Sequence, residues 1–221
     1  MMNSTGTAAD ATPYQREQLA AQQMVKRYIA SADDRVRSEL SKACDGYRGF
    51  RRRVDRFLTA HFDDICSSKC YRSRLSACCS RDGIVTFFAD LVVNALESTA
   101  DELQQLIDVL GGPPNGAKCI YLGPQGCRWK TRPLVCAMFL CDSAQAQVLG
   151  GNTALQGQWA SLRDAAKGFR WPDRPVLFDF LEAHFIAAGY RSSLMYLHNS
   201  PGLLRVKQRA GLIPPGRLRR R

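Results

Sequence analysis

The chain has 221 residues, with 31 Lys and Arg against 20 Asp and Glu, a formal net charge of +11, and 45% hydrophobic residues. This length suffices for one domain that buries its own core, which excludes a chain that needs metal merely to fold. The first residues contain no basic segment followed by an apolar one, and no apolar run approaches the length of a membrane span. We therefore expect a cytoplasmic protein without a membrane span.

The apolar residues of the first third recur at helical spacing. Residues 1–12 are small and polar, and we expect them to be disordered. A helix begins at Pro13 and opens a single helical domain that we expect to span residues 13–213. A later amphipathic helix runs from Tyr47 to Phe62, carries arginines on its other face and leads directly into Cys66.

The longest helical pattern spans Ile84 to Leu110, with a break near Ser98 and Thr99. It begins after the turn-like residues 81–83 and ends at the Gly- and Pro-rich residues 111–116, which cannot continue a helix.

Two short runs follow, around the turn Gly-Pro-Gln-Gly at 123–126, and predict a β-hairpin. Pro133 then permits a helical turn. Further helices are expected at 154–166, 176–188 and 192–198, before a basic tail at 214–221. The predicted fold is mainly α, an irregular helical domain with a short β-hairpin and a cysteine-rich metal-binding region.

Eight of the nine cysteines fall between residues 66 and 141, which is far denser than a core requires. In a reducing compartment such a pattern favours metal or cluster ligation over disulfides. The ninth, Cys44, lies outside this array, and we interpret it as an ordinary buried thiol. The predicted metal ligands are Cys66, Cys70, Cys78, Cys79, Cys119, Cys127, Cys136 and Cys141.

Two kinds of inorganic centre fit these thiols. Zinc takes four thiolates in a tetrahedron, so eight thiols are enough for two such sites, although the common C-x2-C spacing is absent. A [4Fe–4S] cluster needs four thiolates and accepts irregular spacing. Consecutive residues of a helix point about 100° apart. We therefore expect the adjacent Cys78 and Cys79 to bind different metals, or one of them not to bind metal. An iron–sulfur cluster or iron is the preferred prediction, with zinc as the alternative.

The later cysteines carry a resemblance to a known family. The run from Gly126 to Cys141, preceded by Cys119, resembles the bacterial YkgJ-like cysteine-cluster family, whose members are considered to chelate zinc or iron. The family pattern is a first group that ends in a CC pair, then C-x-x-L, a G-C step and an R-P-x-x-C-x3-4-C close. The first group departs from it, since Cys66, Cys70 and Cys78 are more widely spaced. A similar cysteine cluster occurs in a flagellin lysine methylase, so a cluster-containing protein lysine methyltransferase is a further alternative.

Basic residues and histidines leave other possibilities open. The clusters at 48–56 and 217–221 favour an acidic protein partner or nucleic acid, or form a solvated helix face and a loose tail. One alternative is therefore a structural zinc site in a basic interaction module. His61, His184 and His198 are interpreted as structural. Arg132 either lowers the electrostatic cost of gathering thiolates or is simply exposed.

Overall fold

The computed structural model describes residues 11–81 and 85–214. Residues 1–10 of the segment 1–12 that was expected to be disordered, residues 215–221 of the expected tail at 214–221, and residues 82 and 83 of the expected turn at 81–83 lie outside the described residues. The helices in the first part of the chain are α1 (Pro13–Ser31), α2 (Asp34–Ala43), α3 (Asp45–Asp63), α4 (Phe88–Glu97) and α5 (Ala100–Gly111). A π-helix, η2 (Asp64–Tyr71), continues α3 directly.

The second part contains one hairpin and six helices within the described residues. Strands β1 (Leu122–Gly123) and β2 (Gly126–Cys127) pair antiparallel, with Leu122 opposite Cys127. The helices are α6 (Leu134–Ala137), α7 (Asp142–Leu149), α8 (Thr153–Arg170), α9 (Leu177–Ala187), α10 (Tyr196–Asn199) and α11 (Pro201–Arg209). The mainly helical fold with a short hairpin is confirmed, although each strand has only two residues.

Local sequence explains where several helices begin. Thr12 caps α1 because its hydroxyl accepts from the backbone N–H of Gln15, whose side chain accepts from the N–H of Thr12. Thr99 and Glu102 form the same reciprocal pair at the start of α5, which explains the predicted break after α4. Residues 85–87 are not helical and α4 begins at Phe88, so the helix begins later than expected; Ile84 itself lies outside the described residues. The expected helix at 192–198 begins only at Tyr196.

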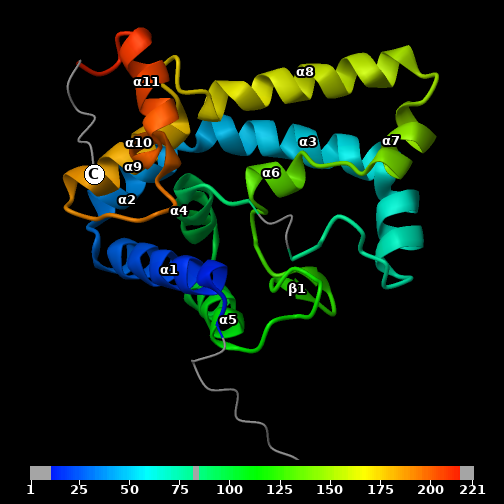
Figure 1. The fold of residues 1–221 in the computed structure, drawn as a ribbon, viewed down its shortest axis with the longest axis horizontal. Helices are drawn as coiled ribbons and strands as arrows, with labels where there is room; N and C mark the ends of the chain where they lie inside the picture. The colour runs from blue at the N-terminus through cyan, green and yellow to red at the C-terminus, as the bar shows by residue number, and fades with distance from the viewer. Residues whose placement is uncertain (1–10, 82–84, 215–221) are drawn as a thin grey trace, which may run out of the picture.

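The main core lies where α1 packs against α4 and α5, and α4 against α9 (Figure 1). Phe88, Leu91, Phe178 and Phe185 are fully buried there. Helices α3 and α8 run alongside each other on the opposite side of the molecule (Figure 1). The hairpin and α6 are packed against this helical framework through the buried side chains of Tyr121, Trp129 and Leu134.

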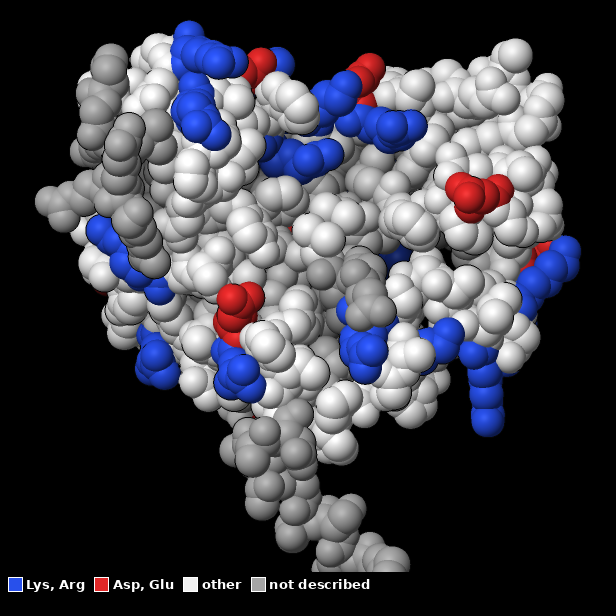
Figure 2. Space-filling model, viewed as in Figure 1, with Lys and Arg blue, Asp and Glu red and all other residues white. Residues whose placement is uncertain are grey.

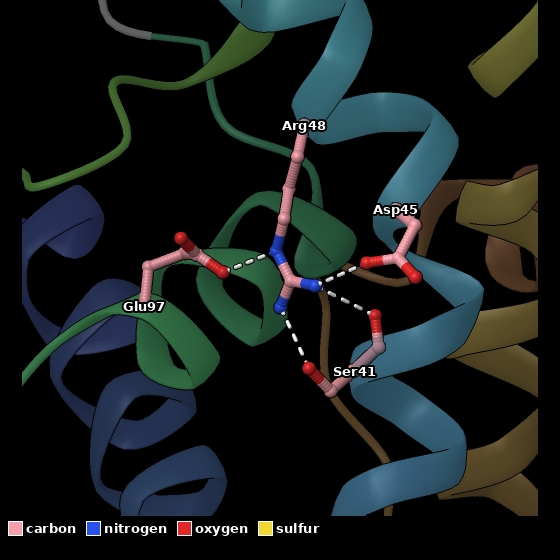
Figure 3. Close-up of polar contacts among 4 residues, drawn as sticks. All are labelled: Ser41, Asp45, Arg48 and Glu97. Atoms are coloured by element: carbon pink, nitrogen blue, oxygen red, sulfur yellow. Dashed lines mark hydrogen bonds and ion pairs between the residues drawn. The ribbon is translucent and has the colours of Figure 1, made fainter.

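Arg48 ties three of these helices together (Figure 3). Its guanidinium donates to the carboxylates of Asp45 at 2.7 Å and of Glu97 on α4, and to the carbonyl and hydroxyl of Ser41 on α2 at 2.9 and 2.8 Å. Charge-assisted bonds of this kind have defined geometry, so they fix the angle at which α2, α3 and α4 meet.

Candidate metal centre

The eight predicted ligands lie on six separate pieces of the chain. Cys66 and Cys70 are on η2, Cys78 and Cys79 on the loop after it, and Cys119 precedes β1. Cys127 is on β2, Cys136 on α6, and Cys141 is the N-cap of α7. All nine cysteines are free thiols. π-Helical turns are uncommon and are frequently found at functional sites, which fits the position of η2 here.

The loop after η2 folds back onto Cys70. The backbone N–H groups of Leu75 and Ser76 donate to the Cys70 carbonyl at 3.0 and 3.2 Å, and the N–H of Ala77 donates to its Sγ at 3.4 Å. Arg74 and Ser76 have φ values of 63° and 39°, in the left-handed region that non-glycine residues rarely adopt. This tight reversal brings the Cys78–Cys79 pair back beside the π-helix.

A short antiparallel contact joins the first cysteine group to the second. The N–H of Cys119 donates to the carbonyl of Cys79 at 2.8 Å, and the N–H of Arg81 donates to the carbonyl of Ala117 at 2.9 Å. The Lys118 ammonium also donates to the carbonyl of Leu75. Cysteines 40 residues apart in the sequence are therefore held side by side by the backbone.

Buried polar side chains of α4 hold the segment that carries Cys136. The carboxylate of Asp90 accepts from the N–H of Leu134, the first residue of α6, and from the N–H of Phe87, both at 2.9 Å. One turn later, the Asn94 side-chain oxygen accepts from the N–H of Thr131 at 2.9 Å. Burial raises the pKa of Asp90 to about 6, despite these hydrogen bonds. Helix α4 thus positions α6 relative to the hairpin.

A second, smaller hydrophobic core positions Cys66 and Cys141. Phe57 of α3 stacks on Trp159 of α8 with ring centroids 5.6 Å apart, and Leu140 and Ala144 complete the cluster with Phe62. Because Phe62 is followed four residues later by Cys66, and Leu140 immediately by Cys141, the packing brings these two thiols to the same side.

The thiols separate into two groups by their electrostatic neighbours. We call Cys79, Cys119, Cys127 and Cys136 the hairpin tetrad, because each of these thiols lies within electrostatic reach of the other three. Burial raises the pKa of Cys119 and of Cys136 to about 11, and charge on the neighbouring thiols adds to both shifts.

The other four thiols form a second group, the π-helix group. Burial raises the pKa of Cys66, and the charges of Cys78, Cys141 and Cys70 raise it further. The Cys78 and Cys79 thiols share a hydrogen bond, which raises the pKa of Cys78 and lowers that of Cys79. The adjacent pair therefore divides between the two groups, with one thiol in each.

Backbone N–H groups point at three thiols of the hairpin tetrad, and the N–H of Val85 is the one directed at Cys136. Burial raises the pKa of Cys119, while hydrogen bonds from the N–H groups of Tyr121 and Leu122 oppose that rise. For Cys127, the N–H of Trp129 opposes the effect of burial in the same way. Hydrogen bonds to the charged form stabilise a thiolate, which is the species that binds metal.

Positive charge also surrounds the thiols. Segments 66–81 and 115–141 contain eight Lys and Arg and no Asp or Glu. Among these, the charge of Arg132 opposes the rise in pKa of Cys66, Cys78, Cys127 and Cys136, so Arg132 lies within reach of both groups. It also forms an ion pair with Asp55 at 3.8 Å. Of its two predicted roles, the electrostatic one is supported.

The thiols are grouped without being in ligating positions. Among residues 11–81 and 85–214, no three His, Cys, Asp or Glu side chains are close enough to hold one metal ion. The metal-binding region of the predicted fold thus remains a prediction. All donors in both groups are thiols, the ligand type that zinc and iron–sulfur clusters accept.

The remaining candidates occupy structural positions. Cys44 is fully buried, as expected, and burial raises its pKa to about 11. The ring of His61 packs edge-on against Phe57, with centroids 4.9 Å apart. His184 contacts the hydroxyl of Tyr28 through Nε2, and His198 pairs with Asp179 at 2.7 Å.

A buried polar layer next to the hairpin tetrad was not predicted. The Tyr121 hydroxyl donates to the side-chain oxygen of Gln18 at 3.2 Å, and the Gln18 amide donates to Thr86. Burial raises the pKa of Tyr14, and the charges of Tyr121 and Cys119 raise it further. The glutamines at 15, 18 and 22 are all buried. Their recurrence at helical spacing was the feature of the sequence that could have predicted this layer.

Comparison with known proteins adds no further assignment: no family model, curated protein or solved structure matches the chain. The YkgJ-like resemblance therefore rests on the cysteine motif alone. In the part of the chain that the structure describes, no helix is both long and apolar enough to cross a membrane.

Proposed function

We propose that this protein binds an inorganic centre through the hairpin tetrad, Cys79, Cys119, Cys127 and Cys136. The observation that carries the proposal is that four thiols lie within electrostatic reach of one another, although they come from the loop after η2, the hairpin and α6. The backbone bond from Cys119 to Cys79 supports it, because this bond joins two of those pieces directly. The N–H groups directed at Cys119 and Cys127 support it further, since they stabilise thiolates.

Metal would draw these thiols inward by small adjustments. Cys127 lies in a two-residue strand, Cys119 precedes the hairpin and Cys136 lies on a four-residue helix, so changes of side-chain rotamer can bring the sulfur atoms closer while the buried neighbours Tyr121 and Leu134 stay in place. Ionised thiolates repel one another, and the basic side chains of segments 66–81 and 115–141 reduce that repulsion. The π-helix group, with Cys66, Cys70, Cys78 and Cys141, offers four thiols for a second centre.

An iron–sulfur cluster or iron is the preferred occupant, and zinc in a structural role is the alternative. Both [4Fe–4S] clusters and tetrahedral zinc take four thiolates, so the grouping fits either. The irregular spacing and a helical core that packs without the cysteines favour the cluster. A zinc site would instead fasten the hairpin to the helices and leave function to a basic surface that binds an acidic partner.

Anaerobic purification with iron, zinc and sulfide analysis tests the proposal. We expect a brown protein with absorbance near 400 nm that dithionite bleaches, which is typical of thiolate-bound iron. A colourless protein with stoichiometric zinc would establish the alternative. A freshly reduced sample that contains neither metal would refute both.

Serine variants test the ligand set. Cys119→Ser and Cys136→Ser should each remove the metal of the hairpin tetrad, because both thiols belong to it. Cys44→Ser is the matched control, since Cys44 is buried away from both groups. Cys66→Ser should remove only metal that belongs to the π-helix group. Equal metal content in the Cys119, Cys136 and Cys44 variants would contradict the assignment.

A further inference from the structure

A pocket between α6 and α8 has a composition that the cysteine site does not explain. Its volume is about 330 Å³, which is within the range of small-molecule sites. One wall is apolar and comes from α6 and the residues after it, including Val135, Met138 and Phe139. Phe139 is 53% exposed, so an aromatic face is left open at this wall.

The opposite wall is basic. Arg163, Lys167 and Arg170 line it from α8, at positions i, i+4 and i+7 of one helix face. They extend over roughly 10 Å at 1.5 Å of rise per residue. Figure 2 shows Lys and Arg side chains gathered along the edge of the molecule that α8 occupies in Figure 1. The pocket therefore combines an apolar wall with a row of cations.

Two of these cations are available to a ligand. Lys167 pairs with Asp164, the single acidic residue of the lining, at 2.7 Å. Within the described ranges, the side chains of Arg163 and Arg170 form no hydrogen bond or ion pair, although the charge of Arg163 lowers the pKa of Asp164 and that of Arg170 opposes the raised pKa of Asp90. Three cations against one carboxylate leave a charge of +2, which matches the charge of about −2 on a phosphate monoester near neutral pH. Guanidinium groups also bind phosphate oxygens in a paired geometry.

We propose that the pocket between α6 and α8 binds a phosphate monoester whose organic part is aromatic. Arg163, Lys167 and Arg170 hold the phosphate, and Val135, Met138 and Phe139 contact the organic part. Cys136 lies on the same turn as Val135 but about 100° around the helix, toward the hairpin tetrad. The ligand therefore sits on the other face of α6 from the proposed metal centre. This inference does not depend on that centre.

Equilibrium dialysis of the full chain at low salt tests the proposal, with AMP and 1-naphthyl phosphate as probes. Three matched ligands serve as controls. Adenosine lacks the phosphate, 1-naphthylacetate carries a carboxylate in its place, and inorganic phosphate lacks the organic part. We expect saturable binding of both monoesters, and at least tenfold weaker binding of the three matched ligands. Equal binding of the naphthyl carboxylate would overturn the phosphate assignment, and no saturable binding of either monoester in the millimolar range would overturn the site.

Variants of opposite sign place the ligand in the pocket. The double variant Arg163→Gln/Arg170→Gln should weaken monoester binding at least tenfold, whereas Asp164→Asn should tighten it, because it removes the opposing charge. Arg205→Gln/Arg209→Gln on α11 makes the same change in net charge away from the pocket and should leave binding unchanged. Equal losses in the two double variants would mean nonspecific attraction and overturn the proposal. Metal content measured on the same samples should not change, which separates this test from that of the metal centre.

Discussion

The packed helices and the cysteine-bearing segments 64–81 and 115–141 differ in what holds them in place. In the helical core, side chains such as Leu91 and Phe178 are fully buried, so apolar burial stabilises the arrangement. The π-helix η2, by contrast, has no buried residue. Its loop is held by backbone bonds, whereas the segment from the hairpin to α6 is joined to the core by the buried side chains of Tyr121, Trp129 and Leu134 and by hydrogen bonds to Asp90 and Asn94.

This contrast suggests that the two parts of the molecule differ in how readily they adjust. A core held by non-directional burial is stable by itself, whereas a segment held by a few directional bonds can adjust when a ligand binds. The candidate metal centre lies between η2 with its loop, which has little buried surface, and the segment from the hairpin to α6, which the core holds in place. Substitutions in the two parts should therefore have different consequences.

The largest effect is expected in the core. Phe185 is fully buried, and its ring lies 4.4 Å from Tyr28 and 5.0 Å from Phe88, measured between centroids. Phe185→Ala should lower the free energy of unfolding by about 3–5 kcal/mol, because it leaves a cavity. Urea titration followed by circular dichroism measures this. Phe180→Ala on the same helix is the control, since that ring is 46% exposed and its loss should change stability by about 0.5 kcal/mol or less. Equal losses would contradict the description of the core.

The next effect concerns the junction between the two parts. Asp90→Ala leaves the buried N–H groups of Phe87 and Leu134 without their acceptor and should lower stability by about 2–4 kcal/mol. It should also increase hydrogen exchange at α6 more than in α5 or α9. Asp101→Ala, on an exposed position of α5, serves as the control. If exchange at α6 is unchanged, α4 does not position the helix that carries Cys136.

The pH dependence of the core gives a smaller effect. Burial raises the pKa of Glu182 to about 8, although its carboxylate accepts from the N–H groups of Leu197 and His198. The unfolded glutamate loses its proton near pH 4.5, so between pH 6 and 8 the folded state binds more protons, and stability falls as pH rises. The fall should be about 2 kcal/mol over this range. Urea titrations of Glu182→Gln should show a much shallower fall there, with the remainder coming from Asp90 near pH 6, and a profile parallel to the wild type would argue against a buried, protonated Glu182.

The smallest effect is expected at Arg132, in the cysteine-bearing part. Arg132→Gln removes a half-exposed cation that favours the thiolates of both groups, so stability should change by about 0.5 kcal/mol or less. Alkylation of Cys127 and Cys136 by iodoacetamide, with metal removed, should become slower, because their pKa values rise. Arg128→Gln is the matched control on the hairpin. Equal rates in the two variants would show that Arg132 has no special place between the groups.

Much of the fold was predictable because local signals agreed with the tertiary outcome. The Thr99 cap and the Pro133 turn are such signals, and both are present in the structure. Helix α7, from Asp142, was not predicted, because its short Ala- and Gln-rich sequence has no clear apolar stripe. Helix α11 was also missed, because its buried residue is Lys207, which becomes favourable only when paired with Asp179 of α9.

The sequence by itself determined that eight thiols fall between residues 66 and 141 of a basic, mainly helical chain, because composition and spacing are local properties. Only the tertiary structure decided how those thiols divide. Cys78 and Cys79 are neighbours in the chain, yet they belong to different groups. The backbone contact with Cys119 places Cys79 in the hairpin tetrad, and the turn beside η2 places Cys78 near Cys66. Contacts between residues far apart in the sequence set this division, and no spacing rule contains them.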